Sequence, residues 1–182
     1  MTQSKTPRNW LTIGALVALG VLVVFVVTRP EPVELQGIET FPDLGQEHID
    51  PAGPAPGYNS NPATSGPHAP QPAPCGIYRE EVPEVFAVHT LEHGAVLIQY
   101  SPEVDADARD RIEEFVREAG SHALAAPRAG LDEPVTLTAW TNKLGLDGAD
   151  IDAIDAFYRR FARSGPEPGV QCPLQIDQAA NG

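Results

Sequence analysis

The sequence predicts an α+β domain that follows a single transmembrane helix, with a mainly antiparallel sheet and two helices arranged in two layers. An uncharged apolar run lies near the N-terminus, and short apolar runs alternate with two amphipathic segments further along the chain. The chain has 182 residues and a net charge of −13, and all 25 acidic residues follow position 30. This charge disfavours binding to nucleic acid or anionic lipid headgroups, so we expect no nucleic-acid partner.

The apolar run near the N-terminus covers 17 residues, Leu11 to Val27, and contains no charged side chain. At 1.5 Å per residue it spans roughly 25–30 Å, which is the thickness of the hydrocarbon core of a bilayer. Lys5 and Arg8 precede the run, and Trp10 lies at its start, as is typical of a helix with a cytoplasmic N-terminus. We therefore expect a transmembrane helix over residues 11–28.

The alternative for this run is a cleaved signal peptide, which requires small residues at its cleavage site. Bulky residues and then Pro30 follow the run, so the sequence favours an uncleaved, single-pass anchor with the membrane as its partner. The predicted organisation is a cytoplasmic N-terminus (1–10), the transmembrane helix (11–28), an acidic Pro/Gly-rich linker (29–57), an extracytoplasmic domain (58–172) and a disordered tail (173–182).

Apolar residues follow two different periods within the predicted domain. Four short apolar runs predict strands: 85–88, 95–100, 122–126 and 135–141. Two longer segments have apolar residues at helical spacing and predict helices: 105–119 and 150–163. Gly120 ends the first of these segments, and Gly165 with Pro166 ends the second. The predicted order is β-β-α-β-β-α, with both helices on one face of the sheet.

Cys75 and Cys172 are the two cysteines of the chain, and they flank most of the predicted domain. An even number of cysteines in an exported domain is what a disulfide requires. A bridge between them closes a long loop, and in the chain-entropy model it stabilises the fold by about 4–5 kcal/mol. Two free thiols, or two thiolate ligands of a metal, are the alternatives.

The stretch His-Thr-Leu-Glu-His-Gly at 89–94 has the spacing of one zinc-peptidase signature, in which two histidines hold the metal and a glutamate activates water. His89 and His93 are four residues apart, so their imidazoles share a face of either a helix or a strand. The apolar runs on both sides, together with Gly94, favour a strand or turn, whereas the peptidase signature requires a long helix. We therefore predict a metal-binding pair and not a peptidase.

His68 lies in a stiff turn, Ser-Gly-Pro-His, and is the third predicted metal ligand. His48 in the linker and Glu92 are further candidates, and zinc or copper is the expected ion, since imidazole suits both. The predicted role is metal handling or assembly of another envelope protein, with no catalytic residue assigned. The main alternative is a non-enzymatic interaction domain with structural histidines; a less favoured one is a metal-dependent hydrolase with Glu92 as general base.

Six stretches form a wider pattern: Asn61–His68, Gly76–Tyr78, Val88–Val96, Ala126–Pro127, Thr138–Trp140 and Gly165–Glu167. Together they resemble domain-of-unknown-function family 3105, over roughly residues 45–170, most specifically in the Ser-Gly-Pro-His and His-x-Leu-Glu-His-Gly blocks. Members of the family are short bacterial proteins, often with one N-terminal membrane span, and usually have a second proline where Ala63 stands. The resemblance implies that the spaced histidines belong to the pattern of the domain, and it implies no established activity.

Overall fold

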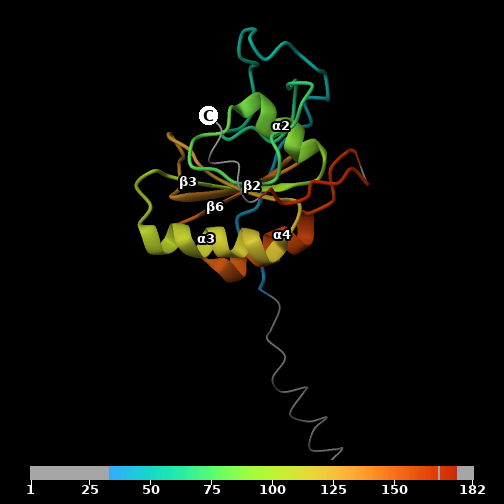
Figure 1. The fold of residues 1–182 in the computed structure, drawn as a ribbon. Coiled ribbons are helices and arrows are strands. Elements are labelled where there is room, and N and C mark those ends of the chain that lie inside the picture. Colours follow the sequence, from blue (N-terminus) through green and yellow to red (C-terminus); the bar gives the residue numbers. More distant parts are fainter. Residues whose placement is uncertain (1–32, 168, 176–182) are drawn as a thin grey trace, which may run out of the picture. The chain divides into compact units, whose positions relative to one another are not determined.

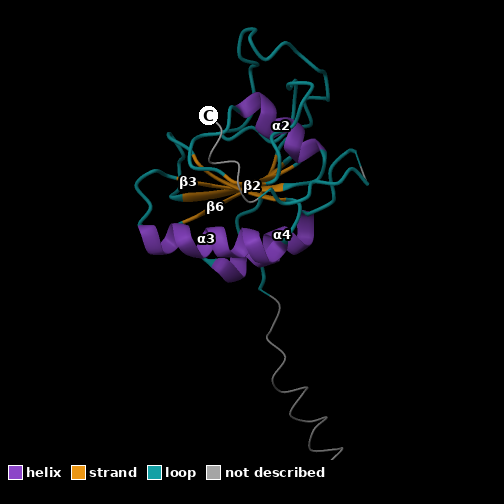
Figure 2. Ribbon diagram, viewed as in Figure 1, coloured by secondary structure: helices purple, strands orange, loops and turns teal. Residues whose placement is uncertain are grey.

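The computed structural model describes residues 33–167 and 169–175, which form the fold drawn in Figures 1 and 2. The predicted transmembrane segment 11–28 lies outside these residues, as does most of the predicted tail. Within the two described ranges, none of the helices combines the length and the apolar character that crossing a bilayer requires.

A mixed sheet of six strands, in the order β1-β6-β5-β3-β4-β2, forms the centre of the domain. The strands are β1 (Glu39–Thr40), β2 (Gly76–Ile77), β3 (Val96–Tyr100), β4 (Ala123–Pro127), β5 (Val135–Ala139) and β6 (Asn142–Leu146). Strand β4 pairs in parallel with β3 and β2, whereas the β1–β6–β5–β3 part is antiparallel. The prediction of a mainly antiparallel sheet is therefore only partly right, because a helix connects β3 to β4 and returns the chain to the same direction.

Three helices cover the sheet: α2 (Glu84–Glu92), α3 (Ala106–Ala119) and α4 (Ile151–Phe161). Helices α3 and α4 pack on one face, and α2 lies on the opposite face (Figure 1). Side chains of β3 accordingly alternate, with Ile98 in the core beneath α3 and α4 and Leu97 in the core beneath α2. The predicted two-layer arrangement is wrong, because the unpredicted helix α2 adds a layer on the second face.

The two helices predicted at 105–119 and 150–163 are confirmed within two residues at each end. Both begin after an aspartate whose carboxylate accepts a hydrogen bond from a backbone N–H in the first turn, at 2.8 Å for Asp105 and 3.1 Å for Asp150. Local capping and an apolar stripe are thus the features by which these two helices are recognised in the sequence.

The strand predicted at 85–88 is wrong, and so is the strand or turn predicted for the histidine motif that follows. Both fall on helix α2, which starts after Pro83 and ends at Glu92; His93 follows the helix, and Gly94 then turns the chain with φ of 79°. Six consecutive residues of this helix, from Ala87 to Glu92, are buried. A helix that is covered on all sides lacks the one-sided apolar stripe by which helices are recognised in a sequence.

Two elements at the antiparallel edge were not predicted. The run 135–141 contains β5, and after Thr141, which has φ of 61°, the chain returns as β6, whose residues are mostly half-buried. Strand β1 pairs with β6 and lies in the segment 29–57 that the sequence predicts as a linker. Part of that segment is therefore built into the sheet.

Cys75 and Cys172 form a disulfide, and their Cα atoms lie 5.6 Å apart. The bridge fastens the segment before β2 to the C-terminal part of the chain, where backbone hydrogen bonds join His122 to Cys172 and Gln175 to Cys75. Neither sulfur is available as a thiolate ligand.

Candidate metal centre

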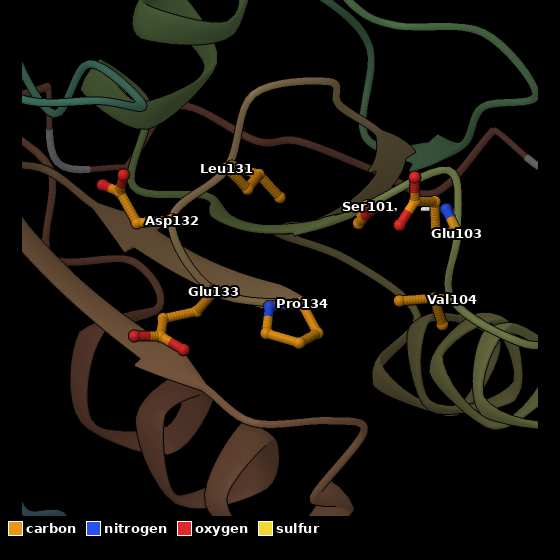
Figure 3. A pocket seen from close by; sticks show the side chains of 7 residues that line it. All are labelled: Ser101, Glu103, Val104, Leu131, Asp132, Glu133 and Pro134. Atoms are coloured by element: carbon orange, nitrogen blue, oxygen red, sulfur yellow. Dashed lines mark hydrogen bonds between the residues drawn. The ribbon is translucent and has the colours of Figure 1, made fainter.

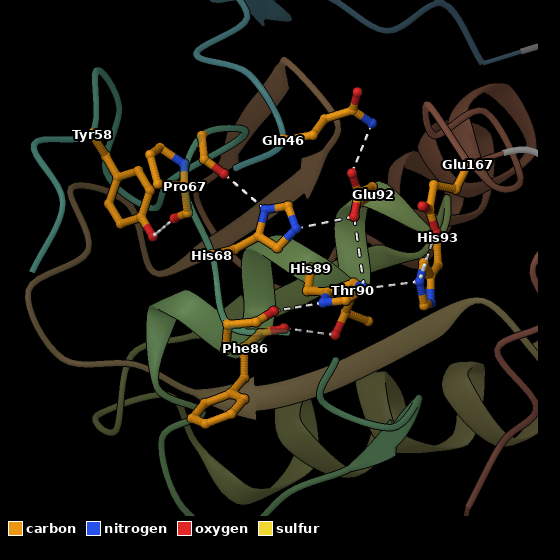
Figure 4. Close-up of polar contacts among 12 residues, drawn as sticks. Gln46, Tyr58, Pro67, His68, Phe86, His89, Thr90, Glu92, His93 and Glu167 are labelled. Carbon is orange, nitrogen blue, oxygen red and sulfur yellow. Dashed lines mark hydrogen bonds and ion pairs between the residues drawn. The ribbon is translucent and has the colours of Figure 1, made fainter. Parts of the chain in front are cut away.

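Side chains from separate parts of the chain meet beside helix α2 (Figure 4). The helix supplies His89, Glu92 and, just past its last residue, His93. These residues are three and four positions apart, so they project from neighbouring places on one side of the helix. The proline-rich tract, residues 51–74, supplies His68, and the segment after β1 supplies His48. Five residues predicted from the sequence as metal ligands are therefore brought together.

His68 is completely buried, and its two ring nitrogens have different environments. Nδ1 lies 2.8 Å from the carbonyl oxygen of Gly66, which only accepts hydrogen bonds, so Nδ1 carries the hydrogen. Nε2 lies 3.0 Å from Oε2 of Glu92, yet neither of these atoms makes a hydrogen bond within the described part of the chain. Burial lowers the pKa of His68, which opposes the second proton that would join the two atoms.

His89 is also buried, and its two ring nitrogens have the same roles as those of His68. Nδ1 lies 2.7 Å from the carbonyl oxygen of Ala69, so it too acts as a hydrogen-bond donor. Nε2 lies 3.7 Å from Oε2 of Glu92 and 3.0 Å from Nε2 of His93. In metal-binding histidines one ring nitrogen commonly donates to a backbone carbonyl and the other binds the ion, which is the arrangement of both His68 and His89.

Glu92 completes the buried part of the cluster, with an exposed fraction of 2 %. Its Oε1 accepts a hydrogen bond of 2.7 Å from the side-chain amide of Gln46, while Oε2 is directed towards His68 and His89. Glu92 forms no ion pair with lysine or arginine among the described residues. A buried carboxylate that lacks such a partner is costly unless another cation neutralises it.

His93 and Glu167 form the more exposed part of the cluster. Nε2 of His93 lies 3.1 Å from Oε2 of Glu167, whose side chain is 46 % exposed. Burial, and then the neighbouring His89, lower the pKa of His93. Glu167 was not predicted as a ligand from the sequence. The stretch Gly165–Glu167 belongs to the family pattern, and this is the feature of the sequence that could have identified it.

Close backbone contact holds Glu167 in place. Its N–H donates to the carbonyl of Glu92 at 3.2 Å, and Arg163 donates to the carbonyl of Gly94 at 2.7 Å. A Cβ atom on Gly165 would lie 2.1 Å from the carbonyl oxygen of Glu92, so only glycine permits this approach. The turn at 165–167 is thus fitted to the C-terminal end of α2.

The cluster contains two overlapping sets of ligand atoms, each within 4.8 Å of one another. The inner group comprises His48, His68, His89 and Glu92, and the rim group comprises His89, Glu92, His93 and Glu167. Ligand atoms around a tetrahedral zinc ion are roughly 3.3 Å apart, given bonds of about 2.0–2.2 Å. Imidazole and carboxylate are ligands of zinc and copper, so both groups have suitable chemistry for either ion.

A separate hollow of about 370 Å³ lies between the loop after β3 and the segment before β5 (Figure 3). Three of its lining residues are acidic: Glu103, Asp132 and Glu133. It contains no histidine, and none of its lining residues has a buried polar atom without a partner. The histidine cluster is therefore the candidate functional site.

The model of one protein family matches residues 52–174 of the chain, and this family is described as "Protein of unknown function (DUF3105)". No curated protein and no solved structure shows a significant match. The matched region contains β2 to α4 and every residue of the inner and rim groups except His48. The chain belongs to the DUF3105 family.

Proposed function

We propose that the domain binds one transition-metal ion, zinc or copper, and that His68, His89 and Glu92 are its principal ligands. One observation carries this proposal: two buried imidazoles are held by backbone carbonyls so that both Nε2 atoms are directed at one unpaired carboxylate oxygen. His48 or His93 supplies the fourth ligand atom, which is a third nitrogen. The role that follows is metal handling at the cell envelope.

The main alternative is a structural cluster within an interaction domain. In that case a further proton must join Nε2 of His68 to Oε2 of Glu92 across the 3.0 Å contact, and a proton on Nε2 gives His68 a positive charge. Burial lowers the pKa of His68 and therefore acts against this state near neutral pH. A bound cation satisfies both atoms without a second proton, and for this reason we favour metal binding.

A hydrolase with Glu92 as general base is less well supported. A general base must be free to take a proton from a water molecule beside the metal. Here Oε1 of Glu92 accepts from Gln46, and Oε2 is the atom proposed to bind the ion, so neither oxygen is left to take a proton from a water molecule. This geometry suits a ligand, and metal storage or transfer is the better proposal.

The location of this site is a proposal from the sequence. We propose that residues 11–28 anchor the chain and that the domain lies outside the cytoplasm, where a disulfide such as Cys75–Cys172 persists. Reporter fusions at residue 60 test this topology. Activity of an exported reporter supports it, and activity restricted to a cytoplasmic reporter contradicts it.

The decisive experiment is elemental analysis of the full chain, purified in detergent and dialysed against zinc or copper. We expect one ion per chain for the wild type. Glu92→Gln, which keeps the shape of the side chain but removes its charge, should lose the ion, whereas Glu118→Gln on the exposed side of α3 should retain it. A wild-type chain that binds neither metal at neutral pH contradicts the proposal, and a structural role of the histidines then stands.

A further inference from the structure

The inner group and the rim group share two ligands, His89 and Glu92. A neutral imidazole with its Nδ1 hydrogen donated to a carbonyl has a single lone pair left, on Nε2. His89 is in this state, because its Nδ1 lies 2.7 Å from the Ala69 carbonyl. His89 can therefore bind an ion in one group or in the other, but not in both at once.

The rim group also has fewer hydrogens than its contacts require. Nε2 of His93 lies 3.0 Å from Nε2 of His89 and 3.1 Å from Oε2 of Glu167. Both neighbours are acceptors: Nε2 of His89 has no hydrogen, because that hydrogen is on Nδ1, and Oε2 of Glu167 belongs to a carboxylate. Nε2 of His93 carries at most one hydrogen, which cannot serve both contacts. A cation at this place satisfies all three atoms.

The two groups differ in their access to solvent. His68, which belongs to the inner group alone, is completely buried, whereas the side chains of His93 and Glu167 are 13 % and 46 % exposed. His48 is exposed as well, but its backbone is held: Ile49 donates to the His68 carbonyl and His68 donates to Glu47. Glu167 is the exposed carboxylate of the cluster, and Figure 4 shows it beyond His93 on the side away from His68.

We propose that the rim group is a second position for the same ion, through which a divalent metal passes between solvent and the inner group. This inference rests on the metal binding proposed above. An ion that moves between the groups keeps His89 and Glu92 throughout and exchanges His48 and His68 for His93 and Glu167. No step leaves the ion without ligands, so the route avoids the cost of a bare ion in a buried site.

The test is the rate of zinc exchange. The full chain loaded with zinc is mixed with an excess of a chromophoric chelator, and release is followed by stopped-flow absorbance; uptake by the metal-free chain is measured in the same way. Glu167→Gln should slow both uptake and release by about tenfold, because the ion loses a ligand at the rim position and the barrier between solvent and the inner group rises by about 1.4 kcal/mol. The dissociation constant should hardly change, because the two rates change together.

Three further variants distinguish passage through the rim group from a purely stabilising role of its side chains. His93→Gln should slow both rates like Glu167→Gln, and Glu118→Gln should leave them unchanged. His48→Gln should instead speed release and weaken binding, since it removes a ligand from the inner group.

Five results contradict the inference. Unchanged rates in Glu167→Gln remove the rim position from the route, and faster release shows that Glu167 only stabilises the bound state. Slower exchange in His48→Gln alone places the route on the other side of the cluster. Two zinc ions per chain show that the groups are independent sites. A wild-type chain that holds no zinc contradicts the metal centre itself, and that failure is seen before any rate is measured.

Discussion

Gln46 donates its side-chain amide to Oε1 of Glu92 across 2.7 Å, and so joins the segment after β1 to helix α2. Gln46 lies in the part of the chain that the sequence predicts as a linker, 46 positions from its partner. The bond fixes the rotation of the carboxylate and directs its other oxygen towards the two buried histidines. A residue that is not itself a ligand therefore sets the geometry of one.

Gln46→Ala is predicted to weaken zinc binding by about 10–100-fold, because partners that orient a ligand have effects of this size. Isothermal titration calorimetry measures the change. Gln171→Ala is a matched control, since the amide of Gln171 is exposed and contacts only a neighbouring carbonyl. Equal affinities in wild type and Gln46→Ala would show that the amide does not orient Glu92.

Gly165→Ala is predicted to lower the free energy of unfolding by about 1–3 kcal/mol, the usual cost of forcing an extra methyl group into a packed site. The added Cβ would lie 2.1 Å from the carbonyl oxygen of Glu92, so the turn at 165–167 must move. Urea unfolding measures the loss. Gly148→Ala is the control, because nothing lies within 4 Å of its added methyl group. Equal stability of the two variants would contradict the close packing of this turn.

Replacing Cys75 and Cys172 together with serine is predicted to lower the free energy of unfolding by about 4–5 kcal/mol in the chain-entropy model, given the 97 positions between them. Guanidinium unfolding of the wild type and the double variant gives this difference. Alkylation of the native protein without a reductant, followed by mass analysis, should modify neither cysteine. Two labelled thiols would refute the bridge.

The Tyr58 hydroxyl donates to the carbonyl of Pro67 at 2.8 Å, and burial, followed by the charge of Glu84, raises the pKa of Tyr58 from 10.0 to about 12. The unfolded chain therefore loses this proton at lower pH than the folded one. Stability due to Tyr58 should be complete below pH 10.0 and should fall as the pH rises towards about 12. Unfolding midpoints across this range, compared with Tyr58→Phe, measure the effect; identical pH profiles of the two proteins would refute it.

The helices α3 and α4 were predictable because each has an apolar stripe and an aspartate cap, which are local features. Helix α2 was not predictable from the sequence. The proline-rich tract covers one side of it and the sheet covers the other, so its apolar residues do not form a one-sided stripe. Strand β6 was missed because its half-buried residues show no clear alternation. In each case the missing information is the neighbour that the element packs against.

The site was predicted better than the fold around it. His89 and His93 share a face in a helix as well as in a strand, so their pairing survived the wrong secondary structure. Glu167 and Gln46 could not be found in this way, because only the folded backbone brings residues so distant in sequence to Glu92. The spacing of residues in the sequence identifies ligands that lie on one helix or strand, but it does not identify ligands that come from other parts of the chain.

The turn at 165–167 gives the cluster an order of assembly. A ribosome makes Gln46 and His48 first and Glu167 more than a hundred residues later, only a few positions before Cys172. Helix α2 is therefore complete well before the segment that closes over its C-terminal end has been made. A chain that stops short of Gly165 contains all four residues of the inner group but lacks the rim carboxylate and the second cysteine. The full set of ligands is thus present only after residue 167 has been synthesised.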